Sequence, residues 1–138
     1  MKSNNLDLVI AEYISKDITQ DENHFFSSKL AIMDTVGCII EASSHKEVME
    51  FASINNLSLN FKNPFKNLNV DESYENISWY LTVLTRWFDY NDTFLAKEWA
   101  HPSDNFGSIY SYFYKNRNYK FNDFANALTK AYEIQGSL

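Results

Sequence analysis

The segment Leu30-Ala31-Ile32-Met33-Asp34-Thr35-Val36-Gly37-Cys38-Ile39-Ile40 is almost continuously apolar. A helix that is hydrophobic on all sides is usually buried, so this stretch predicts a central helix from about residue 22 to residue 42. Asp34 is the exception, and we expect its carboxylate to find hydrogen-bond donors or to stay protonated, because an unpaired buried charge is costly. Gly37 costs about 1 kcal/mol relative to alanine inside a helix, so we expect a neighbouring helix to approach closely there.

Further helices are predicted on both sides of this segment, because apolar residues recur at helical spacing. Near the start of the chain, Leu6, Val9, Ile10, Tyr13 and Ile14 share one helical face. Similar stripes follow around residues 44–55, 73–88, 106–117 and 122–136. Gly (3) and Pro (2) are scarce, which favours long helices over hairpins. Without an internal repeat or a convincing alternating strand, the sequence predicts an all-α fold of about six stacked helices.

Composition narrows the classes of function. The 138 residues suit one domain, and an aromatic fraction of 17% is enough for a sizeable core. A formal net charge of -6, with no basic cluster, argues against nucleic acid and against anionic membrane surfaces as partners. The single Cys38 excludes an internal disulfide and any cluster held by several thiolates of this chain. With no apolar run of membrane-spanning length and no signal peptide, we expect a cytoplasmic location.

Most of the reactive side chains lie in one polar segment between two apolar helices, the polar loop (Asp89–Asn105). It holds Asp89, Asp92, Thr93, Lys97, Glu98, His101, Ser103 and Asp104. A polar loop held by rigid helices is a common setting for catalysis. The same residues also suit a plain structural role, in which they cap the flanking helices and are otherwise solvated.

Two metal-binding interpretations are tested by spacing. A calcium loop that starts at Asp89 needs glycine at its sixth position and glutamate at its twelfth, where this chain has Phe94 and Ala100, so that interpretation fails. A mixed carboxylate–histidine site has four candidate ligands, but no two of them show a recognised ligand spacing. Those candidates are Asp92, Glu98, His101 and Asp104.

Three stretches resemble one known family. Residues 86–105, RWFDYNDTFLAKEWAHPSDN, closely resemble the signature of the 2-methylcitrate dehydratases of the MmgE/PrpD family. Residues 33–38, MDTVGC, and residues 130–136, KAYEIQG, resemble two further helices of that family, in the same order and at similar spacing. The resemblance implies that residues 1–138 correspond to the N-terminal part of a larger helical domain, which a separate lid domain completes.

The resemblance also implies an activity. It is the dehydration of a small tricarboxylate, 2-methylcitrate, to 2-methyl-cis-aconitate in the methylcitrate cycle of propionate catabolism. This lyase (hydro-lyase) reaction needs no cofactor, neither a metal nor an iron–sulfur cluster, and the enzyme is usually a homodimer. The family positions that match Asp89, Thr93 and His101 lie at the active site. We expect His101 to move a proton or to donate to a substrate carboxylate, Asp89 to orient a neighbouring donor, and Thr93 to bind a substrate oxygen.

The chain matches only about the N-terminal third of the family, and near the polar loop it offers few cations for a tricarboxylate: Arg86, Lys97 and His101. We therefore expect the isolated chain to be inactive unless another chain, such as a complementing C-terminal segment, completes the site. The alternative is a non-catalytic helical module, or the remnant of a truncated gene, that binds a partner through its aromatic-rich surface. His24 and His45 are expected to be surface residues.

Overall fold

The computed structural model describes residues 5–16, 22–54, 64–65, 73–97 and 99–137. The elements in these ranges are α1 (Leu6–Ser15), α2 (Glu22–Ser43), α3 (Lys46–Ile54), α4 (Tyr74–Arg86), β1 (Phe94–Leu95), β2 (Trp99–Ala100), the 3-10 helix η1 (Pro102–Asn105), α5 (Phe106–Lys115) and α6 (Phe121–Ser137). The predicted all-α fold is confirmed. One feature was not expected: the polar loop contains a short antiparallel hairpin, in which Phe94 pairs with Ala100 and Leu95 with Trp99.

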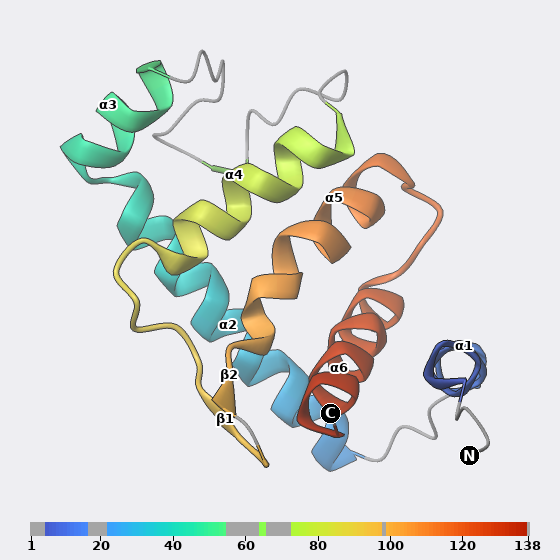
Figure 1. The fold of residues 1–138 in the computed structure, drawn as a ribbon. Coiled ribbons are helices and arrows are strands. Elements are labelled where there is room, and N and C mark those ends of the chain that lie inside the picture. The colour runs from blue at the N-terminus through green and yellow to red at the C-terminus, as the bar shows by residue number, and fades with distance from the viewer. Residues whose placement is uncertain (1–4, 17–21, 55–63, 66–72, 98, 138) are drawn as a thin grey trace.

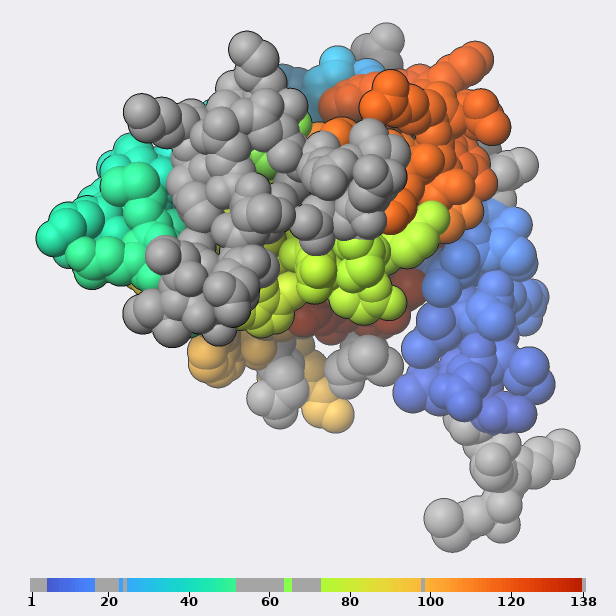
Figure 2. Space-filling model, turned by 90° about the horizontal axis from the view of Figure 1, so that it is seen from above, coloured from blue at the N-terminus to red at the C-terminus, as the bar shows by residue number. Residues whose placement is uncertain are grey.

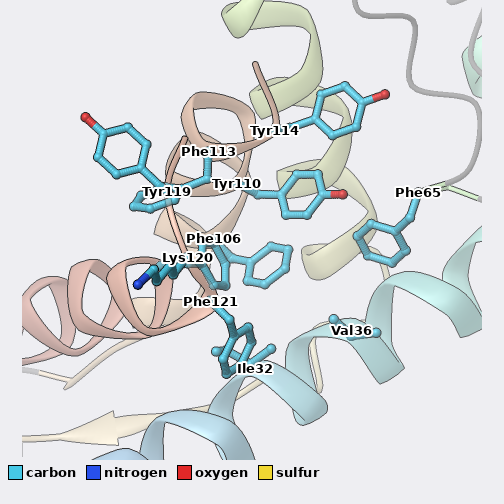
Figure 3. A pocket seen from close by; sticks show the side chains of 11 residues that line it. Ile32, Val36, Phe65, Phe106, Tyr110, Phe113, Tyr114, Tyr119, Lys120 and Phe121 are labelled. Carbon is cyan, nitrogen blue, oxygen red and sulfur yellow. The ribbon is translucent and has the colours of Figure 1, made fainter. Parts of the chain in front are cut away.

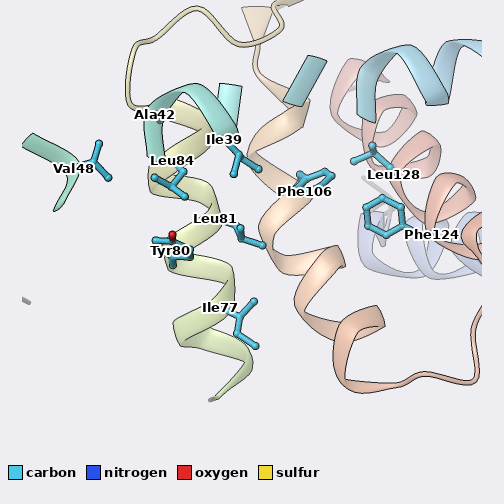
Figure 4. Packing of buried hydrophobic residues seen from close by; sticks show 10 residues of the cluster. All are labelled: Ile39, Ala42, Val48, Ile77, Tyr80, Leu81, Leu84, Phe106, Phe124 and Leu128. Carbon is cyan, nitrogen blue, oxygen red and sulfur yellow. The ribbon is translucent and has the colours of Figure 1, made fainter. Parts of the chain in front are cut away.

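The hydrophobic core lies where four helices meet. In Figure 1, α4 and α5 lie side by side, and α2 and α6 pack against them. Figure 4 shows the buried side chains that these helices and α3 contribute to the core: Ile39, Ala42, Val48, Ile77, Tyr80, Leu81, Leu84, Phe106, Phe124 and Leu128. The polar loop connects the end of α4 to the start of α5, so the same core that joins these two helices also fixes both ends of the loop.

Gly107 lies where α5 packs closely against α4. A Cβ atom at this position of α5 would lie 2.5 Å from the backbone oxygen of Ser78 and 2.7 Å from the Thr82 hydroxyl oxygen, both on α4. Real Cβ atoms essentially never come so near to a backbone oxygen, so only glycine allows α5 to pack against α4 at this distance. The close helix approach that the sequence predicted at Gly37 is found here instead.

The predictions about the central helix need correction. α2 buries Thr35, Cys38, Ile39 and Ala42, but Phe26, Leu30, Met33 and Ile40 are 50–68% exposed. Asp34 and Gly37 are exposed too, and no described atom outside the helix's own backbone lies within 4 Å of a Cβ built on Gly37. The reason is that α4 and α6 cover only one side of α2 in the described part of the chain. None of the described helices is long and apolar enough to cross a membrane.

α1 lies at the edge of the molecule (Figure 2) and has no buried residue. It is held to α6 mainly through polar contacts: the Tyr13 hydroxyl donates to the Glu133 carboxylate, and Lys130 Nζ donates to the backbone oxygen of Ile14 at 2.6 Å. Because these contacts are exposed to solvent, α1 contributes little to the core that positions the polar loop.

Candidate active site in the polar loop

The polar loop begins with a sharp reversal of the chain at Asp89. Its φ of 56° places its backbone in the left-handed region. Residues other than glycine rarely adopt this conformation, although Asp and Asn tolerate it better than most. Its backbone N–H donates to the Arg86 carbonyl at 3.1 Å. Its carboxylate lies 2.8 Å from Arg86 Nη2. Asp89 therefore ends α4 and pairs with the last residue of that helix.

Arg86 joins the two ends of the loop. Besides Asp89, its guanidinium reaches Asn91 Oδ1 at 3.5 Å and Asp104 Oδ1 at 3.7 Å. Burial raises the pKa of the Asp104 carboxyl above its usual value, while the positive charge of Arg86 opposes that rise. One arginine thus stabilises carboxylates that are fifteen residues apart in the sequence.

Two buried side chains hold the middle of the loop closed. Asn91 is 4% exposed, and its Nδ2 donates to the fully buried Ser103 hydroxyl at 2.7 Å. The Ser103 backbone N–H donates to Asp92 Oδ1 at 3.3 Å. These bonds connect the first turn of the loop to η1, and burial makes their loss more costly than that of a surface hydrogen bond.

His101 is half-buried, and its ring has a defined orientation. Nδ1 lies 2.6 Å from the Asp92 carbonyl oxygen, and because a carbonyl can only accept, Nδ1 must carry the hydrogen. The Trp99 ring packs edge-on against the imidazole, with ring centroids 5.3 Å apart. Nε2 has no hydrogen-bond partner among the described residues. In the neutral ring Nε2 carries the lone pair, so this nitrogen is the one that can exchange a proton with a ligand.

The last helix supports the loop from the side. Asn105 Nδ2 donates to Gln135 Oε1 at 3.1 Å and also to the Pro102 carbonyl oxygen. One residue further along α6, Gly136 leaves room for the Phe94 ring, whose nearest atom lies 2.3 Å from where a Cβ would be. Asn105 and Gln135 are thirty residues apart in the sequence, so the stretch around 130–136 and the polar loop form one structural unit.

Comparison with known proteins shows the family of this chain. The model of the MmgE/PrpD N-terminal domain matches residues 9–138, almost the whole chain. The chain belongs to the MmgE/PrpD family. Among its relatives, a mitochondrial 2-methylcitrate dehydratase from Yarrowia lipolytica is 27% identical over 94% of this chain, and a 2-methylcitrate dehydratase from Escherichia coli K12 is 29% identical over 96%. The chain spans 27% and 29% of the length of these two proteins, which is less than a third.

The structure connects two of the three predicted site residues of this MmgE/PrpD chain and leaves the third, Thr93, apart. His101 and Asp89 belong to one network, since both interact electrostatically with Asp104 and Arg86 pairs with Asp89 and Asp104. Thr93 is exposed, and its hydroxyl has no hydrogen-bond partner in the described part of the chain. Asn91 was missed by the sequence reasoning, although a buried asparagine beside a proline turn has few roles other than pairing across the loop.

The other predicted candidates lie elsewhere. Glu98, one of the four candidate metal ligands, falls outside the described residues. In the described part of the chain, no group of three or more His, Cys, Asp or Glu side chains is arranged to hold a metal ion. The side chain of His24 also falls outside them. His45, expected at the surface, keeps 39% of its side chain exposed, and its ring lies 4.5 Å from that of Phe88.

An apolar cavity of about 420 Å³ lies between α2, α5 and the start of α6 (Figure 3). Its lining is mostly aromatic, and Lys120 is its one charged residue. The lining includes Phe65, Tyr110 and Phe113 but no residue of the polar loop. This cavity does not suit a multiply charged ligand, because it offers little to replace the hydration of several carboxylates.

The left-handed backbone at Asp89 should affect the stability of the protein. Replacing Asp89 by alanine should lower the free energy of unfolding by about 1 kcal/mol, because alanine is strained at positive φ. Asp89→Asn should stay within about 0.5 kcal/mol of the unchanged chain, since asparagine tolerates this conformation and the exposed ion pair with Arg86 contributes little. Chemical denaturation of both variants measures the difference. Equal destabilisation by alanine and asparagine would show that the ion pair matters and the backbone does not.

Proposed function

We propose that residues 9–138 act as the N-terminal part of the helical domain of a 2-methylcitrate dehydratase, with His101 at the reacting centre. Membership of the MmgE/PrpD family supports this, as do relatives named for that activity that match along most of the chain. The observation that carries the proposal is the 2.6 Å contact between His101 Nδ1 and the Asp92 carbonyl oxygen, because it leaves Nε2 as the nitrogen that meets a ligand.

The reaction class explains why such a histidine is needed. Dehydration removes a proton from the carbon next to a carboxylate and expels hydroxide from the adjacent carbon, and the products are an alkene and water. Histidine is the side chain whose unperturbed pKa lies nearest to neutrality, so it can take up or give up a proton at ordinary pH. In the proposed reaction, His101 Nε2 accepts the substrate proton, or in its protonated form donates to a substrate carboxylate. Asp89 keeps Arg86 oriented, and Thr93, being exposed, is free to bind a substrate oxygen.

The charge of the substrate sets a further requirement. A tricarboxylate loses much hydration on binding, and several cations must replace it. Arg86, at the end of α4, is already paired with Asp89 and Asp104, so of the cations in and beside the described part of the loop only Lys97 and His101 remain to meet substrate. We therefore propose that further cations come from protein outside this chain, either from a C-terminal segment or from a partner subunit of a homodimer. The single cysteine suits a reducing compartment, and we propose the cytoplasm.

The test is a comparison of two proteins. The purified 138-residue chain should show no detectable dehydration when it is mixed with 2-methylcitrate, because too few cations meet the substrate. A chimera, in which residues 9–138 replace the matching segment of the E. coli K12 relative, should dehydrate 2-methylcitrate. Ultraviolet absorbance of the product's conjugated double bond measures both activities.

The contrary results are informative. Robust turnover by the isolated chain would show that no further cations are required. A folded chimera without turnover would favour the alternative of a non-catalytic helical module. The aromatic cavity gives that alternative its support, because its lining would suit an apolar side chain of a partner.

A further inference from the structure

One face of α6 is turned toward the polar loop. Tyr132, Gln135 and Gly136 are spaced three and four residues apart, so they share this face. Gln135 accepts a hydrogen bond from Asn105, Gly136 makes room for Phe94, and the Phe94 ring lies edge-on to the Tyr132 ring at 6.4 Å between centroids. Gln135 and Gly136 thus contact the loop directly, and the ring of Tyr132 does so through Phe94. The contacts of the Tyr132 hydroxyl remain to be accounted for.

Asp92 lies between this face and His101. Its carbonyl oxygen accepts from His101 Nδ1, and its Oδ1 accepts from the Ser103 backbone N–H. Its Oδ2 is fully buried and has no hydrogen-bond partner among the described residues. A buried carboxylate oxygen without a donor is costly, so the fold should supply a donor close by.

The Tyr132 hydroxyl is the matching group. It too is fully buried without a partner among the described residues, and it is a donor where Asp92 Oδ2 is an acceptor. Burial raises the pKa of the Tyr132 hydroxyl well above its usual value, and the adjacent Asp92 carboxylate raises it further. The hydroxyl therefore keeps its proton at every ordinary pH, and it remains available to donate.

We propose that Tyr132 is a positioning residue for His101: its hydroxyl donates to Asp92 Oδ2 and thereby fixes the Asp92 carbonyl that holds His101 Nδ1. The chain of contacts runs from α6 through Asp92 to the imidazole, so a change at Tyr132 acts on the ring without touching it. The consequence for catalysis rests on the proposed function, whereas the effect on the imidazole does not.

The first experiment uses the 138-residue chain itself. In the unchanged protein, nitrogen NMR of the histidine rings should show His101 with its hydrogen mainly on Nδ1. Tyr132→Phe keeps the aromatic ring and removes only the hydroxyl. It should lower the ratio of the Nδ1–H to the Nε2–H form by about three- to tenfold, the factor that one net hydrogen bond supports. The matched control is Tyr110→Phe, which removes the hydroxyl of a half-buried tyrosine on α5 that lines the aromatic cavity.

The outcomes separate this proposal from a merely structural role. If Tyr132→Phe shifts the melting temperature but leaves the His101 tautomer ratio where Tyr110→Phe leaves it, the proposal is wrong. A tautomer ratio that changes in Tyr132→Phe but not in Tyr110→Phe supports the proposal. In the active chimera, Tyr132→Phe should lower kcat about tenfold, leave KM nearly unchanged, and move the pH dependence of kcat. A chimera that lacks turnover altogether would count against the proposed dehydratase function and would leave the NMR result standing.

Discussion

Replacing His101 by asparagine should lower the dehydration rate of the chimera by about 100-fold or more, the usual contribution of a positioned acid or base. The asparagine amide N–H occupies nearly the place of Nδ1–H, so the bond to the Asp92 carbonyl oxygen is kept. Nε2 is lost. The substitution thus removes the proton-transferring nitrogen and leaves the loop in place, and kcat should fall while the melting temperature stays close to that of the unchanged protein.

A glutamine at the same position separates the two roles proposed for His101. Its amide N–H reaches nearly the place of Nε2 and can donate to a carboxylate, but it cannot take up a proton. If His101 acts by proton transfer, His101→Gln should be as inactive as His101→Asn. If it acts by donating to a substrate carboxylate, glutamine should restore at least about a tenth of the rate, because a neutral donor replaces a charged one.

The matched control is His45→Asn. His45 is also half-buried, but it pairs with Glu41 on α2 and no hydrogen bond links it to the polar loop in the described part of the chain. Its variant should keep nearly full turnover. Retention of more than about a third of kcat by His101→Asn would rule out acid–base work by His101, since the expected loss is far larger.

A second large effect is expected at the contact between α4 and α5. Gly107→Ala should lower the free energy of unfolding by about 1–3 kcal/mol, because the added methyl group meets the Ser78 carbonyl oxygen and helix backbones cannot yield cheaply. For a chain of this size that corresponds to a fall in melting temperature of roughly 3–12 °C. Displacement of α5 would also move η1, so the His101–Asp92 bond should weaken together with stability.

A matched control is a second glycine that lies in a helix but has open space around it. Gly37 is exposed on α2 with open space at its Cβ position. Gly37→Ala should therefore stabilise the chain by about 0.5–1 kcal/mol, since alanine has less backbone freedom to lose in a helix. Thermal and chemical unfolding of the pair measures both effects. Similar behaviour of the two variants would mean that α5 does not approach α4 as closely as described.

Much of the fold follows from local patterns. The stripes of apolar residues place α1, α3, α4, α5 and α6 correctly, because residues three and four positions apart share one face of a helix whatever its neighbours are. The continuous apolar run places α2. Ser73 illustrates how far local chemistry reaches: its hydroxyl accepts from the Asn76 backbone N–H at 3.1 Å and begins α4, as the sequence around it indicates. The polar loop can also be predicted from the sequence, because a run of reactive side chains separates two apolar helices.

The errors arose where a residue's surroundings come from distant parts of the chain. A continuously apolar run cannot show which of its faces a neighbour covers, so the exposed stripe of α2 was taken for buried surface. Gly37 and Gly107 both lie in helices, and only the packing of α4 on α5 shows which of them a close contact requires. The hairpin of β1 and β2 was missed because two-residue strands are too short to carry an alternating pattern.

The same division applies to the candidate site. Which residue types gather between α4 and α5, and which family they resemble, could be inferred from the order of residues along the chain. The tautomer of His101, the bridging role of Arg86 and the support from Tyr132 could not, because each depends on atoms brought together across the loop or from α6. The sequence determines which side chains are present and where they lie along the chain. The hydrogen bonds that orient these side chains form only when separate segments pack at a particular distance.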